Sequence, residues 1–216
     1  MKASVLKVRR CPANSIAVMN NEEGDTSFSS SKMKRGIIVS LLVATLVVLA
    51  DQLTKSLIIK HLDWGEAWNP IPSLRWLVNL TPVINEGGVC GYFQGSGLRF
   101  IIIGVVVIGA MPILWRSLPV NRTLIRVSLG LLLAGAIGNL LDRLRFGHVI
   151  DFVSVEFISW PVFNVADSAM VIGTGILGYY LFLEEEEQEG KEGAPLRASL
   201  KFVPLVLGVA LFSFYF

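Results

Sequence analysis

The chain has 216 residues, of which 53% are hydrophobic and only 17% are charged, and its formal net charge is +2. A soluble domain of this size is usually less apolar and more charged, so the composition favours a membrane protein. The small net charge argues against a nucleic-acid partner, and two cysteines without a CxxC pair argue against a disulfide framework.

The first 97 residues fall into three parts. Residues 1–35 are polar and of mixed charge, and we predict that they form a disordered N-terminal leader. A first membrane span is predicted over about residues 36–60, directly after a basic cluster. Residues 61–97 contain prolines, glycines, tryptophans and short alternating runs. These features predict a small strand-rich segment at a membrane interface.

The remaining elements complete a predicted four-span membrane domain over residues 36–183. Further spans are expected over residues 98–118, 124–144 and 162–183. Residues 184–198 predict an acidic linker, and the apolar segment 199–216 is marginal in length but could form a fifth helix. The expected fold class is an all-α polytopic membrane protein with four transmembrane helices and a small β-rich cradle.

The basic residues predict the orientation of the spans. One basic cluster precedes the first span, and three arginines lie between the second and third spans. Both groups fall on the same side of a four-span protein, and the positive-inside rule makes that side cytoplasmic. Segment 61–97 and the connection 145–161 then share the outer face, so Asp151 and Asp167 are predicted to lie near the outer leaflet.

Polar side chains recur at helical spacing inside the first and third spans. Asp51 and Lys55 lie at i and i+4, and predict an ion pair with a structural or substrate-positioning role. Asn139, Asp142 and Arg143 lie at i, i+3 and i+4. We expect Asp142 and Arg143 to compensate each other's charge, and Asn139 to form a hydrogen bond to another helix.

Asp151 and Asp167 are harder to explain as structural residues. They lie sixteen residues apart in a nearly apolar stretch that also contains Asn164, and no lysine is nearby in sequence. Two carboxylates near one depth predict either a dyad that shares a proton or the ion site of a proton-linked transporter. The sequence has no internal repeat of the kind that transporters often show. An assembly protein without catalysis would not need the two carboxylates.

Four blocks of the sequence resemble those of one known family. The blocks are DQLTK (51–55), NEGG (85–88), GAIGNLLDRLRFGHVIDF (135–152) and FNVADSAM (163–170). In this order they are similar to the blocks of lipoprotein signal peptidase, also called signal peptidase II. The resemblance covers roughly residues 36–183, and the last two blocks together are highly specific. At Cys90 the family usually has an aromatic residue, and residues 1–35 and 184–216 lie outside its pattern.

The resemblance implies a four-span aspartyl endopeptidase of the bacterial inner membrane, with its active site toward the periplasm. Its substrates would be prolipoproteins that carry a diacylglyceryl group on the lipobox cysteine, and it would cut just before that cysteine. The segment 61–97 would be a periplasmic cradle for the substrate peptide. The family needs no metal or organic cofactor and is the target of globomycin-type antibiotics, and a monomer is the simplest expectation.

The resemblance also implies roles for individual residues. Asp151 and Asp167 match the catalytic aspartates of the family. Ten further residues match its substrate-binding or structural positions: Asp51, Lys55, Asn85, Gly87, Gly135, Asn139, Asp142, Arg143, Asn164 and Ala166.

Overall fold

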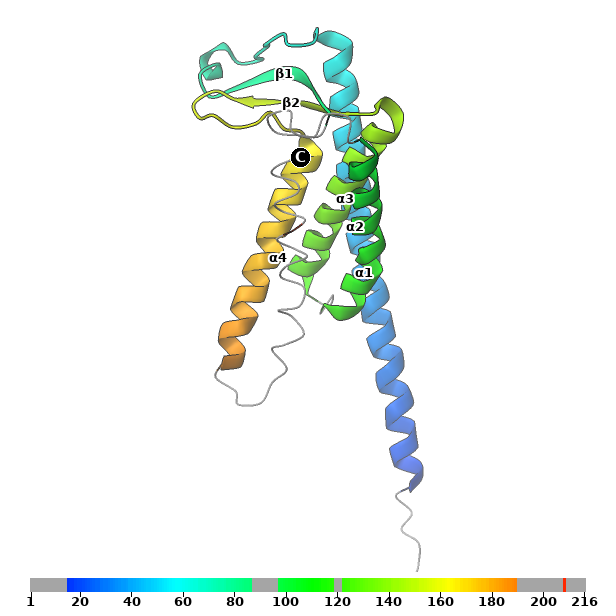
Figure 1. Ribbon diagram of the computed structural model, residues 1–216. Helices are drawn as coiled ribbons and strands as arrows, with labels where there is room; N and C mark the ends of the chain where they lie inside the picture. The colour runs from blue at the N-terminus through cyan, green and yellow to red at the C-terminus, as the bar shows by residue number, and fades with distance from the viewer. Residues whose placement is uncertain (1–14, 87–96, 119–121, 190–207, 209–216) are drawn as a thin grey trace, which may run out of the picture.

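Four α-helices and a two-stranded sheet make up the part of the chain that the computed structural model describes, which is residues 15–86, 97–118, 122–189 and 208. The sheet lies across one end of the helices (Figure 1). In chain order the elements are α1 (Ser15–His61), the 3-10 helix η1 (Pro72–Leu74), β1 (Val78–Asn85), α2 (Gly97–Ser117), α3 (Thr123–Phe146), β2 (Val149–Val155) and α4 (Val165–Glu189).

Three helical segments among the described residues are long and apolar enough to cross a membrane. They are Lys34–His61, Leu98–Ser117 and Thr123–Phe146, and they coincide with the first three predicted spans. The fourth predicted span falls on α4, which lies alongside α3 (Figure 1). That α4 also crosses the membrane stays a prediction.

Two predicted boundaries need correction. Helix α1 begins at Ser15, so residues 15–35 are helical and not disordered. Helix α4 continues to Glu189, so the first six residues of the predicted linker are helical too. Extending a helix that is already nucleated costs far less than starting one, and the glutamates after residue 183 are good helix formers. The predicted fifth helix lies outside the described residues, except for Gly208, which is helical.

The first span of α1 carries polar side chains inward and leucines outward. Ser40, Asp51 and Lys55 are 0%, 0% and 2% exposed, whereas Leu46 and Leu53 are 67% and 62% exposed. A helix on the surface of a soluble protein has the opposite arrangement. The outer face of α1 is therefore suited to lipid, and its inner face to a polar site.

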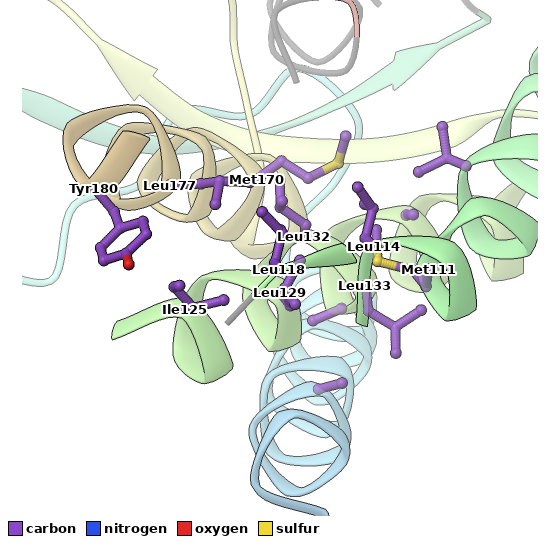
Figure 2. Packing of buried hydrophobic residues seen from close by; sticks show 14 residues of the cluster. Met111, Leu114, Leu118, Ile125, Leu129, Leu132, Leu133, Met170, Leu177 and Tyr180 are labelled. Atoms are coloured by element: carbon purple, nitrogen blue, oxygen red, sulfur yellow. The ribbon is translucent and has the colours of Figure 1, made fainter. Parts of the chain in front are cut away.

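The hydrophobic core surrounds α3, which contacts α1, α2 and α4. Figure 2 shows how the side chains of three helices interlock there. The labelled residues are Met111 and Leu114 of α2, Leu118 directly after it, Ile125, Leu129, Leu132 and Leu133 of α3, and Met170, Leu177 and Tyr180 of α4. Most of them come from the end of the bundle away from the sheet, so the sheet end is left to polar residues.

The sheet brings two distant segments together. Strand β1 runs antiparallel to β2, with Val83 opposite Asp151 and Asn85 opposite Val149. Segment 61–97 was predicted to be strand-rich, but its partner β2 was missed in the connection 145–161. The run VIDFVSV is rich in β-branched residues, which was the available signal.

Gly147 turns the chain from α3 into β2. It ends α3 in the left-handed conformation, with φ of 81°, and its N–H donates to the carbonyl of Arg143 at 3.0 Å. Side chains with a Cβ rarely adopt this conformation, which glycine adopts freely. Only one residue then separates the turn from β2, so Asp151 lies directly over the end of α3.

Helices α3 and α4 approach closely at glycines. A Cβ at Gly135 would lie 2.5 Å from the carbonyl oxygen of Ala166, which is too close for any real contact. A Cβ at Gly138 would lie 2.8 Å from a carboxylate oxygen of Asp51 and 3.0 Å from the Cβ of Ala166. These two glycines allow the start of α4 to sit against α3 and the acidic residue of α1.

Candidate active site

Asp151 lies in β2 and is 2% exposed. Its Oδ2 accepts a hydrogen bond from the side-chain amide of Asn85 in β1 at 2.9 Å. Its Oδ1 accepts one from the amide of Asn164, just before α4, at 2.7 Å. Three elements that are far apart in sequence therefore position this carboxyl group.

Asp167 lies in the first turn of α4. The side-chain amide of Asn139 in α3 donates to its Oδ1 at 2.6 Å, and the backbone N–H of Asn164 donates to its Oδ2 at 3.1 Å. In return, the N–H of Asp167 donates to Oδ1 of Asn164 at 2.9 Å. This reciprocal pair is a capping box, so the geometry that begins the helix also orients the carboxylate.

Asn164 joins the two aspartates. The same residue donates to Asp151 from its side chain and to Asp167 from its backbone. Its position follows from pairing of the preceding residue with β2, since the N–H of Phe163 donates to the carbonyl of Val153 at 3.1 Å. Asp151 and Asp167, the two residues that match the catalytic aspartates of the similar family, therefore lie close together at the sheet end of the helices.

Lys55 forms ion pairs with two buried carboxylates. Its Nζ lies 2.8 Å from Asp51 Oδ2 and 2.7 Å from Asp142 Oδ2, and all three side chains are at most 3% exposed. The pairing of Asp51 with Lys55 was expected from the sequence. For Asp142 the expected partner was Arg143, whose charge does act on it, and the structure adds an ion pair with Lys55 of α1 that the sequence did not predict. Adjacent residues on a helix point in different directions, whereas Asp142 faces α1.

Positive charge reaches the two aspartates from α1 and α3. The guanidinium of Arg143 interacts electrostatically with Asp151 and Asp167, and it lies 5.0 Å from the ring centroid of Phe100. The charge of Lys55 also acts on both carboxyl groups. The sequence suggested two unpaired carboxylates, because neither cation is their neighbour along the chain.

The environment of Asp151 favours a protonated carboxyl. Burial, and next to it the negative charge of Asp167, raise the pKa of Asp151 to about 7. The hydrogen bonds from Asn85 and Asn164 act in the opposite direction, as does the charge of Lys55. An aspartate that titrates near neutral pH beside a second carboxylate can exchange a proton with a substrate.

Most of the other predicted site residues surround the two aspartates. Asn139 forms the expected hydrogen bond across helices, and Ala166 is fully buried where Gly135 faces α4. Gly87 and Cys90 lie outside the described residues. Among the described residues, no three His, Cys, Asp or Glu side chains converge in a way that could hold a metal ion.

Sequence reasoning missed Gln52. Its side-chain amide donates to Asp142 Oδ1 at 2.9 Å and to Asp51 Oδ2 at 3.2 Å, so it belongs to the same polar cluster as Lys55. The available signal was the presence of an uncharged polar side chain in an apolar span, beside Asp51, because polar groups inside membranes usually have partners.

Comparisons with known proteins show which family the chain is similar to. The model of a family described as signal peptidase (SPase) II matches residues 43–183. The chain is 44% identical over 154 residues to the lipoprotein signal peptidase of Moorella thermoacetica, with 70% of this chain and 97% of that protein covered. It is 35% identical over 158 residues to that of Anoxybacillus flavithermus, with 72% and 92% covered.

Two solved structures, both described as bacterial membrane enzymes studied by the in meso method, have the same fold. One gives a TM-score of 0.66 at 31% identity and covers 73% of this chain and 96% of that one. The other gives 0.62 at 32% identity and covers 67% and 93%. The matched family segment contains both aspartates and the buried cluster beneath them. The chain therefore belongs to the signal peptidase II family.

Proposed function

We propose that this protein is a membrane-embedded aspartyl endopeptidase that removes the signal peptide from diacylglyceryl-modified prolipoproteins. The cut falls directly before the lipidated cysteine. One arrangement carries the proposal: Asn164 donates to Asp151 at 2.7 Å and to Asp167 at 3.1 Å, so two carboxyl groups flank a single residue. Names of the relatives support the substrate class, since they are lipoprotein signal peptidases.

In the proposed reaction, a water molecule attacks the carbonyl carbon of the scissile peptide bond. Asp167 takes a proton from the water, while the protonated Asp151 donates a hydrogen bond to the carbonyl oxygen. In this proposal the proton that the pair shares rests on Asp151, whose pKa is raised to about 7 by burial and by the charge of Asp167. When the tetrahedral intermediate collapses, the C–N bond breaks and Asp167 passes its proton to the leaving nitrogen.

The proposed location is the bacterial inner membrane, with the two aspartates near the periplasmic leaflet. The basic residues just before the apolar part of α1, and those around the connection from α2 to α3, favour a cytoplasmic position for that end of the bundle. The sheet lies at the opposite end (Figure 1), with Asp151 in β2 and Asp167 in the first turn of α4. The lipid tails of the substrate would stay in the bilayer while its peptide lies under the cradle.

Purified protein in detergent and a diacylglyceryl-modified prolipoprotein provide the direct test. Mass spectrometry of the products should locate the cut before the modified cysteine. Unmodified precursor serves as the control, and should be cut poorly because its lipid anchor is missing. If well-folded protein leaves the modified precursor intact, the proposal fails, and proton-linked transport by the same aspartates becomes the reading to test.

The rate of cleavage is expected to fall as the pH rises above about 7. Above the pKa of Asp151 the pair loses its shared proton, and neither carboxyl can donate to the substrate carbonyl. The free energy of unfolding is also expected to decrease as the pH rises. Because the pKa is raised from 3.8 to about 7, the stability that this proton contributes is fully present below 3.8 and is lost as the pH rises through 7.

The matching measurement is kcat/KM as a function of pH for the wild type and for Asn85→Ala. The Asn85 hydrogen bond lowers the pKa of Asp151, so removing it should move the alkaline limb of the profile to higher pH. An alkaline limb that stays in place in this variant would argue against the assignment of the proton to Asp151.

Exposed tryptophans should report the position of the sheet end at the membrane surface. Trp64, Trp68, Trp76 and Trp160 are 53%, 47%, 66% and 40% exposed, and all four lie outside the membrane-spanning helices. Tryptophans at this level favour the lipid headgroup region. The fifth tryptophan, Trp115, lies inside α2, so the Trp115→Phe variant keeps only these four. In liposomes, the tryptophan fluorescence of this variant should be quenched more by lipids brominated near the headgroup than by lipids brominated at the chain ends. Equal quenching by both, or none, would contradict an interfacial sheet.

A further inference from the structure

Two buried carboxylates hold the backbone beside the two aspartates of the proposed dyad. Asp142 Oδ2 accepts a hydrogen bond from the N–H of Ile150 at 3.3 Å, and Ile150 directly precedes Asp151. Asp51 Oδ1 accepts one from the N–H of Ala166 at 2.9 Å, and Ala166 directly precedes Asp167. The relative position of Asp51 and Asp142 therefore sets the relative position of the dyad.

Lys55 cannot hold this pair of carboxylates alone. Its ammonium contacts Asp51, Asp142 and the side-chain oxygen of Asn139 at 3.3 Å, which uses its three hydrogens. One ammonium balances only one of the two carboxylates, and the charge of Arg143 also acts on Asp142. Further hydrogen-bond donors are needed to keep both carboxylates buried at this spacing.

Gln52 supplies those donors in a fixed orientation. Its Nε2 reaches Asp142 Oδ1 at 2.9 Å and Asp51 Oδ2 at 3.2 Å, and also lies 3.4 Å from the carbonyl of Gly138. Its Oε1 accepts a hydrogen bond from Nη1 of Arg145 at 2.9 Å. Because Arg145 has no acceptor, it holds the oxygen end of the amide and so aims the NH₂ end at the carboxylates.

We propose that Gln52 is a positioning residue for the dyad, acting through Asp51 and Asp142 on the backbone beside Asp167 and Asp151. This inference rests on the proposed function. Gln52 does not touch the dyad itself, so it sets where the two carboxyl groups stand and takes no part in proton transfer. The charged groups that Gln52 contacts are Asp51 of α1 and Asp142 and Arg145 of α3. Lys55 lies between the two carboxylates, and the charge of Arg143 acts on Asp142, Asp151 and Asp167.

The Gln52→Glu variant is the sharpest test, because it keeps the shape and the acceptor for Arg145 but removes the donor. At neutral pH it places a third carboxylate against Asp51 and Asp142. We expect kcat to fall by about ten- to a hundredfold with little change in KM, as for a small misplacement of reacting groups. At lower pH, protonation of the introduced carboxyl restores a donor, so its activity relative to wild type should recover.

Two further variants complete the experiment: Gln52→Met, which tests the loss of the donor alone, and Thr54→Val, which is the control. Gln52→Met removes the donor without adding charge, so kcat should fall without recovery at low pH. The Thr54 hydroxyl donates only to carbonyls of its own helix, at 2.8 and 2.9 Å, so Thr54→Val should behave as wild type. Equal kcat in wild type and Gln52→Met, or a matching loss in Thr54→Val, would overturn the proposal.

An infrared titration separates this inference from the proposed function. The carboxylic C=O stretching band that disappears in Asp151→Asn reports the protonation of Asp151 without any substrate. The pH at which this band reaches half its intensity should change in Gln52→Met and stay the same in Thr54→Val, whether or not the protein cleaves lipoproteins. An unmoved midpoint in Gln52→Met contradicts a positioning role. Wild type that titrates as expected but does not cleave contradicts the proposed function alone.

Discussion

Asp151→Asn is expected to abolish cleavage of diacylglyceryl-modified prolipoprotein while the protein stays folded. The substitution keeps the shape of the side chain, and one oxygen remains to accept hydrogen bonds from Asn85 or Asn164. What it removes is the exchangeable proton that the substrate carbonyl requires. General acid–base groups contribute about a hundred- to ten-thousandfold to a rate, and the loss in Asp151→Asn should lie in that range.

The measurement is single-turnover cleavage together with binding of the lipidated precursor. Binding should persist in Asp151→Asn, because the lipid contacts are intact. Glu156→Gln, an exposed carboxylate just past the end of β2, is the matched control and should retain full activity. Asp167→Asn should be equally inactive, but it also changes the cap of α4, so its thermal stability must be measured beside its rate. Cleavage by a folded Asp151→Asn protein at the wild-type rate would contradict the proposed mechanism, in which both aspartates take part.

Lys55→Met is expected to destabilise the protein more than any other single substitution in the polar cluster. It removes the cation from between Asp51 and Asp142, at 2.8 and 2.7 Å, and leaves two buried carboxylates without the ion-pair partner that they share. Removing one partner of a buried ion pair costs about 3–5 kcal/mol. The backbone anchors at Ile150 and Ala166 should loosen with it, so activity should be lost as well.

Thermal unfolding in detergent measures this effect, with Lys60→Met as the control from the exposed end of the same helix. The double variant Lys55→Met with Asp142→Asn should recover part of the lost stability, because one of the two uncompensated charges is gone. A Lys55→Met protein as stable as Lys60→Met would mean that the carboxylates are solvated and that the buried cluster does not hold the fold.

The sequence predicted the helices well and their partners less well. Runs of about 20 apolar residues are read directly from the chain, and three of the predicted spans coincide with helices that could cross a membrane. The i, i+3 spacing of Asn164 and Asp167 is present in the sequence, but the cap that the two residues form was not predicted from it. By contrast, the ends of α1 and α4 were misplaced, because helix propagation beyond a span depends on the nucleated helix and not on local polarity.

Contacts between distant segments explain the remaining errors. The ion pair of Asp142 with Lys55 depends on which face of α3 meets α1, and spacing along one helix does not contain that information. The same holds for Gln52, whose partners on α3 lie 86 and 90 residues away. Strand β2 carried its own signal, but its register with β1, which sets Asn85 beside Asp151, is a property of the assembled sheet.

The close approach at Gly135 has a consequence for how the gene can change. Every replacement of a glycine adds a Cβ, and at this position the obstacle includes the backbone carbonyl of Ala166, at 2.5 Å. Shortening the side chain of Met170, which also faces this position, would not remove that obstacle. A second substitution elsewhere cannot easily restore the fit. We therefore expect no other residue to replace Gly135 by stepwise substitution during evolution. Relatives that have replaced more than half of their residues should still share a glycine at this point.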